Sequence, residues 1–487
     1  MEKMTIKEIV EAVDGVLLCG DESLCVTSVS TNSNEIEKDA LFVPIIGERT
    51  DAHNYIQGAF ANGAIATFTS RHTKDSDDME NGVYIQVEDT LRAMQKLATA
   101  YREKFEVPVI GITGSVGKTT TKEMISAALA TKYNVLKTKG NMNSQVGLAL
   151  MMFEINQDTE VAVIEMGMSE WHEMERLVQI AKPKYAVMTN IGVSHIGQLG
   201  SKENIRKEKL NIINCMDENS ILYLNGDDRL LLDVAEGKLK EEHTTPLTKE
   251  ALTKVSFHIF STNECDREER VFFAKDIKAR ENGMEFTYVN GEEEADVKLS
   301  VLGMHNVGNA LVAMAIAKQF GIAPQDAAKG LLAYAPIAMR GQIFEKDGIR
   351  IIDDTYNASP DSMKSGIGVL LMMEGTGRRF AVLADVLELG EDSYRCHYEV
   401  GGFIANEKNG ENYVNELLCI GTEAKAIADG LLHAGTDLSE KIIVHKFEYN
   451  EQAIAYLKEH LQKGDIVMVK GSRGMHTEEI VESLNAV

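Results

Sequence analysis

The stretch VPVIGITGSVGKTTTKEMISAALA, from Val107 to Ala130, decides the fold of this chain. Its first residues are apolar and rich in β-branched side chains, which predicts a buried strand. A loop with Gly111, Gly114 and Gly117 follows, and apolar residues then recur at helical spacing. Strand, glycine-rich loop and helix form a unit that cradles phosphate, because backbone N–H groups of the loop and the helix N-terminus face the phosphate oxygens. The sequence therefore predicts a site for a nucleoside triphosphate.

The loop departs slightly from the phosphate-binding pattern G-x-x-x-x-G-K-[ST]. The first glycine of that pattern would fall at Ile112, and Gly111 lies one residue earlier. An ordinary glycine turn that caps a helix is the alternative interpretation. We expect Lys118 to reach the terminal phosphates and the Thr119 hydroxyl to bind Mg²⁺. The residues expected to contact ATP in this stretch are Gly114, Ser115, Gly117, Lys118, Thr119 and Thr120.

Length and charge limit the class of protein. A chain of 487 residues is too long for one ordinary core, so roughly two to four domains are expected. The net charge of −25 disfavours binding to nucleic acid or to an anionic membrane surface. A nucleotide can still bind such a protein through local dipoles and Mg²⁺. Small molecules are therefore the partners that we expect.

The cysteines and the N-terminus indicate the compartment. The six cysteines are scattered and include no C-x-x-C pair, which favours free thiols in a reducing cytosol. The first residues, MEKMTIKEIVEAVDGV, predict an amphipathic helix that Thr5 caps and that runs through Val13, not a signal peptide. No apolar run reaches the roughly 18 residues of a membrane span. We expect a cytoplasmic protein without a membrane segment.

The alternation of strands and helices predicts an α/β protein with three domains. Residues 1–85 form a small α/β unit, residues 86–335 a central, largely parallel sheet with the phosphate loop, and residues 336–487 a second doubly wound, Rossmann-like sheet. Within the central unit, Val271–Ile277 and Met284–Val289 predict a β-hairpin with a turn near Asn282, and Val297–Leu302 predicts a further strand.

Polar residues at the ends of two central strands are candidates for chemistry. Glu165 ends the predicted strand Val161–Glu165, where a carboxylate can hold Mg²⁺ beside the β- and γ-phosphates. His195 follows the next strand end, and a lone histidine in isolation is more often a structural hydrogen-bonding group. Its place in the same sheet as the phosphate loop favours a metal ligand. By spacing alone, Lys209 is one lysine on a solvated helix.

Further candidates come later in the chain. His305-Asn306 and Asn309 begin a helix, where asparagine is a good N-cap. Arg340 lies between domains and can reach a phosphate or a carboxylate; a hinge ion pair is the alternative. Together these residues indicate a Mg-ATP enzyme with three domains, and they fit more than one ATP-using chemistry. They do not select the acceptor of the phosphoryl group.

Eight segments carry a resemblance to a known family along nearly the whole chain. They are GITGSVGKTTTKEM (111–124), EMG (165–167), TNIGVSHIGQLGSKENI (189–205), GMHNVGNAL (303–311), MRGQ (339–342), DDTYNASPDSM (353–363), LELGEDSYRCHYEVG (387–401) and VKGSRGMHTEEIV (469–481). With these segments the chain resembles the Mur ligase family. DDTYNASP and KGSRG are most like the members that add D-alanyl-D-alanine.

The resemblance implies an ATP-dependent ligase of peptidoglycan precursor synthesis. Its expected reaction joins D-Ala-D-Ala to UDP-N-acetylmuramoyl-tripeptide (UDP-MurNAc-tripeptide) through an acyl phosphate. The first unit would bind the UDP end of the substrate, the central unit ATP, and the third unit would close over both. The enzyme is expected to be a monomer with two Mg²⁺ ions. Another amino-acid-adding Mur or folylpolyglutamate-type ligase is one alternative, and a P-loop switch that signals to partners is another.

The resemblance also assigns roles to residues. Glu165 and Thr119 would hold the first Mg²⁺ and His195 the second, while Lys209 matches a lysine that is carbamylated in several members and bridges the metals. The catalytic set is thus Lys118, His195, Lys209 and Arg340. Asn306 and Asn309 would line the adenine site, with Arg340 and Asp354 on the ribose and phosphate side. Tyr356, Asn357 and Ser359 would line the dipeptide pocket, and Ser33, Asn34 and Gly47 the UDP end.

The chain departs from the family pattern at a few positions. Asn34 stands where an arginine is common in the UDP-binding loop, and Ser359 replaces a usual asparagine. Ala384-Asp385-Val386 replaces a usual Gly-Asp-Met, and GNMNSQVGLAL (140–150) lacks a common proline. The change at Asn34 bears most on the diphosphate contacts.

Overall fold

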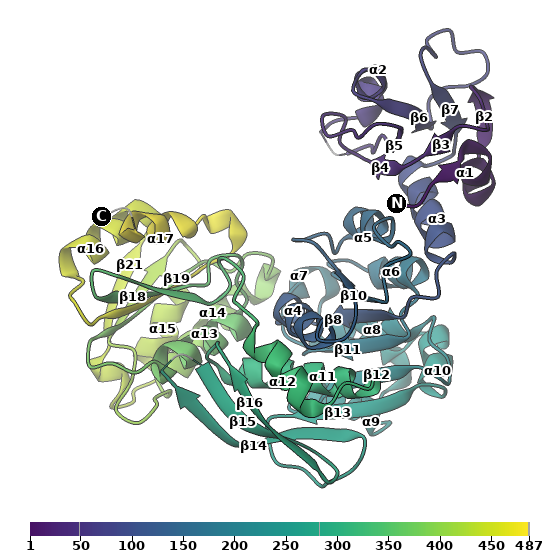
Figure 1. The fold of residues 1–487 in the computed structure, drawn as a ribbon. Helices are drawn as coiled ribbons and strands as arrows, with labels where there is room; N and C mark the ends of the chain where they lie inside the picture. The colour runs from purple at the N-terminus through teal and green to yellow at the C-terminus, as the bar shows by residue number, and fades with distance from the viewer. Residues whose placement is uncertain (48, 282, 486–487) are drawn as a thin grey trace.

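The computed structural model describes residues 1–47, 49–281 and 283–485. It has the predicted α/β class. Figure 1 shows an N-terminal unit in purple, a central unit in blue to teal and a C-terminal unit in green to yellow. The strands of these described residues form four sheets, and the three larger ones lie in the three units in turn.

The N-terminal unit is built on a sheet with strand order β2-β7-β6-β5-β4. β2 pairs antiparallel with β7 and the remaining neighbours are parallel. The predicted first helix is present, with Thr5 as its N-cap. The bounds of this unit are β1 (Met4–Thr5), α1 (Ile6–Val13), β2 (Val16–Cys19), β3 (Cys25–Val26), β4 (Ser28–Ser30), β5 (Ala40–Phe42), η1 (Ala52–Tyr55), α2 (Ile56–Ala61), β6 (Ala64–Thr69) and β7 (Val83–Gln86).

The central unit contains the sheet β16-β15-β14-β13-β12-β11-β8-β10-β9. Its strands are β8 (Val109–Thr113), β9 (Val135–Lys137), β10 (Val161–Glu165), β11 (Tyr185–Met188), β12 (Ile221–Asn225), β13 (Ser256–Ser261), β14 (Val271–Arg280), β15 (Gly283–Asn290) and β16 (Glu293–Leu299). Its helices are α3 (Thr90–Arg102), α4 (Lys118–Leu129), α5 (Gln145–Met152), α6 (Glu173–Ala181), α7 (Ile196–Leu199), α8 (Lys202–Leu210), η2 (Asn211–Ile213), α9 (Arg229–Ala235), η3 (Glu241–His243), α10 (Pro246–Leu252), α11 (Met304–Gln319) and α12 (Pro324–Leu332).

The register of this sheet brings three strand ends together. β8 lies between β10 and β11 and runs parallel to both. Glu165 of β10 pairs with Ile112, and Met188 of β11 pairs with Thr113. The carboxyl ends of the three strands therefore meet at one edge, where open parallel sheets bind ligands. The phosphate loop leaves β8 at this edge.

The edge of the central sheet away from β8 is antiparallel. β14, β15 and β16 pair antiparallel, and this meander joins the parallel part through β13 and β14. The predicted hairpin is therefore confirmed, although the Asn282 of its turn lies outside the described residues. The strand predicted at Val297–Leu302 was misplaced: β16 ends at Leu299, so that Leu302 is free to bond the following helix through its carbonyl.

The C-terminal unit is the second predicted sheet, with order β17-β18-β22-β19-β20-β21. β17 pairs antiparallel with β18 and the others are parallel. Its elements are β17 (Gln342–Lys346), β18 (Ile349–Asp353), α13 (Pro360–Met372), β19 (Arg379–Ala384), η4 (Gly390–Asp392), α14 (Ser393–Ile404), β20 (Glu416–Ile420), α15 (Lys425–His433), η5 (Ser439–Lys441), β21 (Ile443–Phe447), α16 (Asn450–His460), β22 (Ile466–Lys470), η6 (Arg473–Met475) and α17 (Glu478–Asn485).

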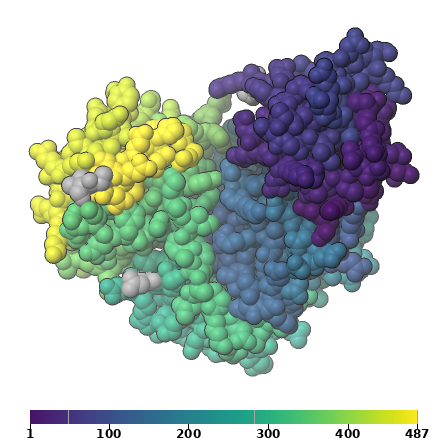
Figure 2. Space-filling model, turned by 45° about the horizontal axis from the view of Figure 1, so that its top comes forward, coloured from purple at the N-terminus to yellow at the C-terminus, as the bar shows by residue number. Residues whose placement is uncertain are grey.

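The units pack around the central one. α11 and α12 cover α4, and α11 also touches α13 of the C-terminal unit. In the space-filling view the purple unit lies over the blue central unit, with the green and yellow unit beside them (Figure 2). Within the described residues, no helix is long and apolar enough to cross a membrane.

Candidate active site

The phosphate loop has the backbone geometry that its glycines predict. Gly117 is the N-cap of α4 with φ of 87°, and Gly114 has φ of 148°. A Cβ on Gly114 would overlap the Thr189 hydroxyl, so only glycine fits there. Loop hydrogen bonds to Asn190 further fix the turn, with Val116 N donating to Asn190 Oδ1 at 2.9 Å. The loop is a rigid cradle at the N-terminus of α4.

Lys118 is folded back onto this loop. Its Nζ donates to the Gly114 carbonyl at 2.8 Å. Burial lowers the pKa of Lys118, Glu165 opposes that shift, and the charge of Arg340 adds to it. The lysine must leave the Gly114 carbonyl to reach a phosphate, which offers a stronger, charged acceptor.

Glu165 and Thr119 form the pair expected of a magnesium site. The Thr119 hydroxyl donates to Glu165 Oε2 at 2.9 Å, and both residues are buried. Asn143 Nδ2 donates to the other carboxylate oxygen at 2.8 Å, and the Glu165 N–H donates to Thr138 Oγ1 at 2.9 Å. Carboxylate and hydroxyl oxygens suit Mg²⁺, which binds through few protein ligands and keeps water and phosphate as the others.

Asn143 and Thr138 were not predicted from the sequence. Asn143 lies in the segment 140–150, which was noted without a role, and Thr138 follows β9. Both orient a carboxylate that they meet only after folding, as supporting residues of metal sites do. The one available signal for them in the sequence was that polar residues follow β9, the strand that lies next to β10.

His195 and Lys209 lie at the same edge. His195 precedes α7 with φ of 64°, and its Nδ1 is 3.0 Å from Glu388 Oε2 of the C-terminal unit. Burial lowers the pKa of His195, the charges of Lys209 and Lys118 lower it further, and Glu388 opposes them. The imidazole is therefore biased toward its neutral form, which is the form that binds metals.

Lys209 is not on a solvated face. It lies on α8 with 1% of its surface exposed. Burial holds the pKa of Lys209 well below its ordinary value, and the charge of Lys118 lowers it further. These surroundings favour the unprotonated amine, which is the nucleophilic form of a lysine.

The described residues do not bring three His, Cys, Asp or Glu side chains together as a ready-made metal cluster. Glu165, with Thr119 beside it, is the carboxylate expected at the first metal site. His195 and Lys209 come from the loop and helix that follow β11. Any ion here would complete its shell from phosphate oxygens and water, which is how Mg²⁺ binds in phosphoryl-transfer sites.

Asn309 ties α11 to α4, and Asn306 supports it from the same helix. Asn309 Oδ1 accepts from Thr121 Oγ1 at 2.9 Å, and Asn309 Nδ2 donates to Asn306 Oδ1 at 3.3 Å. Asn306 Nδ2 donates to the Leu302 carbonyl at 2.7 Å. Gly303, not asparagine, is the N-cap of α11. The position of both amides against α4 is compatible with the expected nucleotide contacts, which stay a prediction.

Arg340 and Asp354 lie on the C-terminal side. The Arg340 guanidinium stacks 3.9 Å from the centre of the Tyr356 ring, a cation–π contact. Asp354 Oδ2 accepts from Lys470 Nζ at 2.5 Å, and the same ammonium donates to the Asn357 carbonyl at 3.0 Å. Lys470 of the KGSRG segment thus joins two of the expected site residues, and no role was predicted for it.

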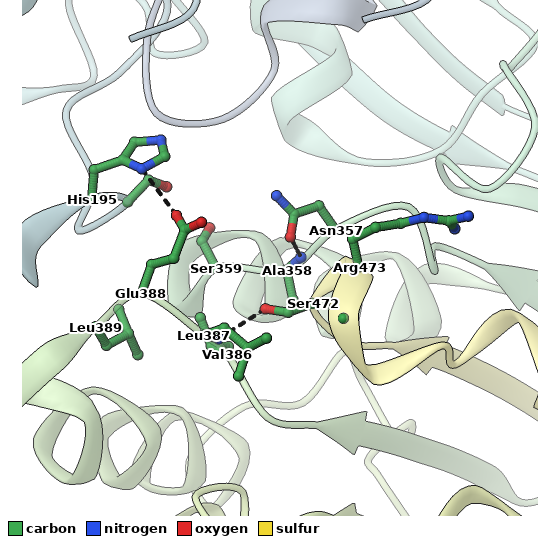
Figure 3. Close-up of a pocket in the computed structure, with 12 residues that line it drawn as sticks. His195, Asn357, Ala358, Ser359, Val386, Leu387, Glu388, Leu389, Ser472 and Arg473 are labelled. Atoms are coloured by element: carbon green, nitrogen blue, oxygen red, sulfur yellow. Dashed lines mark hydrogen bonds and ion pairs between the residues drawn. The ribbon is translucent and has the colours of Figure 1, made fainter. Parts of the chain in front are cut away.

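Asn357 and Ser359 line a cavity of about 130 Å³ between the central and C-terminal units. Ser359 is the N-cap of α13 and its hydroxyl accepts from the Ser362 N–H, so it also has a structural role. Figure 3 shows His195 and Glu388 at one end of the cavity and Arg473 at the other. The rest of the lining is Ser194, Ala358, Val386, Leu387, Leu389, Ser472 and Gly474. Tyr356, which stacks on Arg340, is not among these lining residues.

The residues expected at the UDP end lie in loops of the N-terminal unit. The Ser33 carbonyl accepts a hydrogen bond from the Asn62 side-chain amide. Asn34 is exposed, and its backbone N–H donates to Asn32 Oδ1. Gly47 N donates to the Thr50 carbonyl at 2.9 Å. The neighbouring Glu48 lies outside the described residues.

A buried histidine supports the second of these loops. His53 Nδ1 lies 2.6 Å from Asp51 Oδ1, and its Nε2 accepts from the Ser70 N–H at 3.1 Å. Asp51 also pairs with Arg71. This contact ties the loop to the end of β6.

Fold and site together define a P-loop nucleotide-binding protein with a second α/β unit over the phosphate edge. Residues 112–317 match the Mur ligase middle domain, and residues 339–473 match the Mur ligase, glutamate ligase domain. The chain belongs to the Mur ligase family.

Full-length relatives are found among both sequences and structures. The UDP-N-acetylmuramoyl-tripeptide–D-alanyl-D-alanine ligase of Bacillus subtilis (strain 168) is 38% identical over 99% of each chain. A crystal structure of MurF from Acinetobacter baumannii matches with a TM-score of 0.86 and 26% identity over 100% of both chains. MurF ligase from Thermotoga maritima, in complex with ADP, matches with a TM-score of 0.77 and 29% identity over 94% of this chain and 97% of that one.

Proposed function

We propose that this chain joins D-Ala-D-Ala to UDP-MurNAc-tripeptide at the expense of ATP, in the synthesis of peptidoglycan precursors. One observation carries the proposal: the likeness to the Bacillus subtilis ligase runs over 99% of both chains, including the N-terminal and C-terminal units. The specific substrates named for that relative would each meet a unit of this chain. Residues 1–85 would bind the UDP end, residues 86–335 ATP, and residues 336–487 the incoming dipeptide.

The site supports an acyl-phosphate mechanism. The phosphate loop and Lys118 would hold ATP with its γ-phosphate at the edge where β8, β10 and β11 end. The substrate carboxylate attacks the γ-phosphorus and releases ADP. The dipeptide amine then attacks the acyl carbon, loses a proton and expels phosphate. Lys118 and Arg340 place positive charge where negative charge develops, which is how most phosphoryl-transfer sites work.

Magnesium fits the residues at this edge. Thr119 and Glu165 would hold the first ion, and His195 with Lys209 the second, Lys209 as its carbamate. Bound there, the ions would neutralise charge on the phosphate oxygens. The neutral bias of His195 and the lowered pKa of Lys209 support these assignments. His195 must be neutral to bind an ion, and the Lys209 amine must be unprotonated to form the carbamate. Two ions remain part of the proposal.

Compartment and assembly are proposed on the same basis. All six cysteines are free, which suits a reducing cytoplasm. We propose that the protein acts there as a monomer, with its small-molecule substrates as its partners.

A component-omission assay tests the function. Purified protein receives ATP, Mg²⁺, UDP-MurNAc-tripeptide and D-Ala-D-Ala, and phosphate release is followed while each component is left out in turn. We expect steady turnover only in the complete mixture. Turnover that ignores the dipeptide would contradict the proposal and favour a P-loop switch or another acceptor.

The variant Lys118→Ala refines this test. Because Lys118 lies on the central unit and the UDP end on the N-terminal unit, the variant should lose turnover by at least about 100-fold. Its affinity for UDP-MurNAc-tripeptide, measured by calorimetry without ATP, should be unchanged. The exposed Lys132→Ala, just past the C-terminal end of the same helix, is the matched control and should be active. Loss of UDP-substrate binding in Lys118→Ala would contradict the assignment of units.

A further inference from the structure

The cavity between the central and C-terminal units carries opposite charges at its two ends. Glu388 stands at the end beside His195, and Arg473 stands at the other (Figure 3). The side chains of both are more than half exposed, at 59% and 56%. Between them the cavity is lined by short polar or apolar side chains, including those of Asn357, Ser472 and Leu387. A molecule that fits this cavity would be small, cationic at one end and anionic at the other.

We propose that Glu388 binds the ammonium group of the incoming dipeptide and that Arg473 binds its carboxylate. This assignment rests on the proposed function, in which the acceptor is a zwitterionic dipeptide. It adds two specificity-determining residues that the sequence did not single out. It also fixes the direction in which the dipeptide lies.

The direction follows from where the reaction must occur. The dipeptide amine has to meet the acyl carbon next to the phosphate edge, and His195 belongs to that edge. Glu388 is the acidic residue of the cavity that reaches His195, with Oε2 at 3.0 Å from Nδ1. An ammonium group held there would face the phosphate edge, and the carboxylate would point away toward η6. A dipeptide of two extended residues spans at most about 7 Å.

The local backbone supports a functional role for Glu388. It has φ of 68°, a left-handed conformation that costs energy for a residue with a side chain. The loop is kept in place by its neighbours, because the Leu387 N–H donates to Ser472 Oγ at 2.9 Å. That bond also joins the Glu388 loop to the Arg473 loop. The two charges are thus presented by one preformed surface.

The middle of the cavity suits the dipeptide methyl groups. Leu387 is an apolar side chain with 46% of its surface exposed. The Leu387 side chain lies against Gly474. A Cβ at position 474 would come within 2.9 Å of Leu387 Cδ1. The Arg473 guanidinium pairs with the Glu478 carboxylate, with Nη1 3.1 Å from Oε1, and it also contacts the Met339 sulfur. A substrate carboxylate would therefore bind a guanidinium that Glu478 already orients.

Matched substrates test the carboxylate end. D-alanyl-D-alaninamide keeps the ammonium and lacks the carboxylate. In the wild-type enzyme we expect its kcat/KM to be about 10- to 100-fold below that of D-Ala-D-Ala, as for loss of a charged hydrogen bond. In Arg473→Gln the two substrates should become nearly equal, and Arg473→Lys should restore part of the preference. An undiminished preference in Arg473→Gln would overturn the assignment.

A separate readout tests the ammonium end. Glu388→Gln should raise KM for D-Ala-D-Ala about 10- to 100-fold. Acyl-phosphate formation, trapped with hydroxylamine in the absence of dipeptide, should proceed at the wild-type rate. Glu391→Gln, an exposed neighbour, is the control and should change neither. If Glu388→Gln slows hydroxamate formation, the residue acts through His195 and the assignment fails.

The same measurements separate this inference from the proposed function. If wild-type protein forms the hydroxamate but shows no dipeptide-dependent turnover, the proposed acceptor is wrong, and both assignments fall with it. If the dipeptide is the acceptor and the two variants behave like Glu391→Gln, only the assignments of Glu388 and Arg473 are overturned.

Discussion

Lys209 is the residue whose chemistry changes most between sequence and structure. By spacing it is one of several lysines on a helix, and in the fold it is buried next to Lys118. Burial lowers the pKa of this amine, because there is little water to solvate a charge. An unprotonated amine can add carbon dioxide, and the carbamate that results is a carboxylate-like metal ligand.

We therefore expect Lys209 to be carbamylated in the active enzyme. Carbon-13 NMR with labelled bicarbonate should show a carbamate signal that disappears in Lys209→Ala. Since only the unprotonated amine reacts, the signal should weaken as pH falls. Because the pKa of Lys209 is lowered, the signal should persist to lower pH than the carbamate signal of an exposed lysine would.

Activity should follow the carbamate. Lys209→Ala should lower kcat by about 100- to 1,000-fold, and formate or acetate should restore part of it by supplying the missing carboxylate. Lys207→Ala is the control and should remain active. Lys207 lies on the same helix, and its Nζ donates to the Glu242 carbonyl. Full activity of wild-type enzyme in carbon dioxide-free buffer would contradict this prediction.

Among the elements, α1 was predictable down to its cap. Thr5 Oγ1 accepts from the Glu8 N–H at 3.2 Å, and Glu8 Oε2 accepts from the Thr5 N–H at 2.7 Å. This capping box, with help from Lys104, lowers the pKa of Glu8 to about 2. The backbone hydrogen bond from Thr5 is the largest cause.

The lowered pKa makes the cap sensitive to pH. The pKa of Glu8 is lower in the folded chain than in the unfolded one, so its contribution is complete above about 4.5 and is lost as pH falls toward about 2. Glu8→Ala should cost α1 about 1 kcal/mol near pH 7, and less below pH 4.5. Amide exchange of α1, with wild type compared at each pH, measures this. Glu11→Ala on the same helix is the control, and an equal cost at both pH values would count against the prediction.

Elements defined by local pattern were predictable, and contacts between distant elements were not. The strand that ends at Glu165 and the phosphate loop were predicted because apolar runs and glycine spacing are local signals. The bond from Thr121 to Asn309 joins residues 188 apart in the chain. The bond from Asn143 to Glu165 likewise needs the folded sheet. Such partners are set by packing, and no spacing rule reports them.

For the whole molecule, the decisive feature is where the C-terminal unit approaches the phosphate edge. Gly192, in the loop after β11, lies against Asp361 in the first turn of α13 and against Ser115 of the phosphate loop. The Val193 N–H points at Asp361 Oδ2 at 3.4 Å. A few residues in this loop thus set how close the two units come.

Gly192→Ala should therefore impair catalysis without disturbing either unit. A Cβ at this position would overlap the Asp361 carboxylate and lie 3.2 Å from Ser115 Cβ. The Asp361 side chain must therefore move, and we expect the C-terminal unit to shift outward with it. Displacement by an ångström can cost about 100-fold in rate, and we expect kcat to fall by roughly 10- to 100-fold. The free energy of unfolding should stay within about 0.5 kcal/mol of wild type, because the backbone conformation suits any residue.

Two further variants make this prediction decisive. Gly368→Ala, in α13 with open space around it, places the same methyl group away from the contact and should leave kcat unchanged. If overlap with Asp361 is the cause, Asp361→Ala should relieve it, so that the double variant is more active than Gly192→Ala alone. Small-angle scattering should show a larger radius of gyration for Gly192→Ala than for wild type. Full turnover in Gly192→Ala would mean that catalysis tolerates a wider separation of the units than this contact allows.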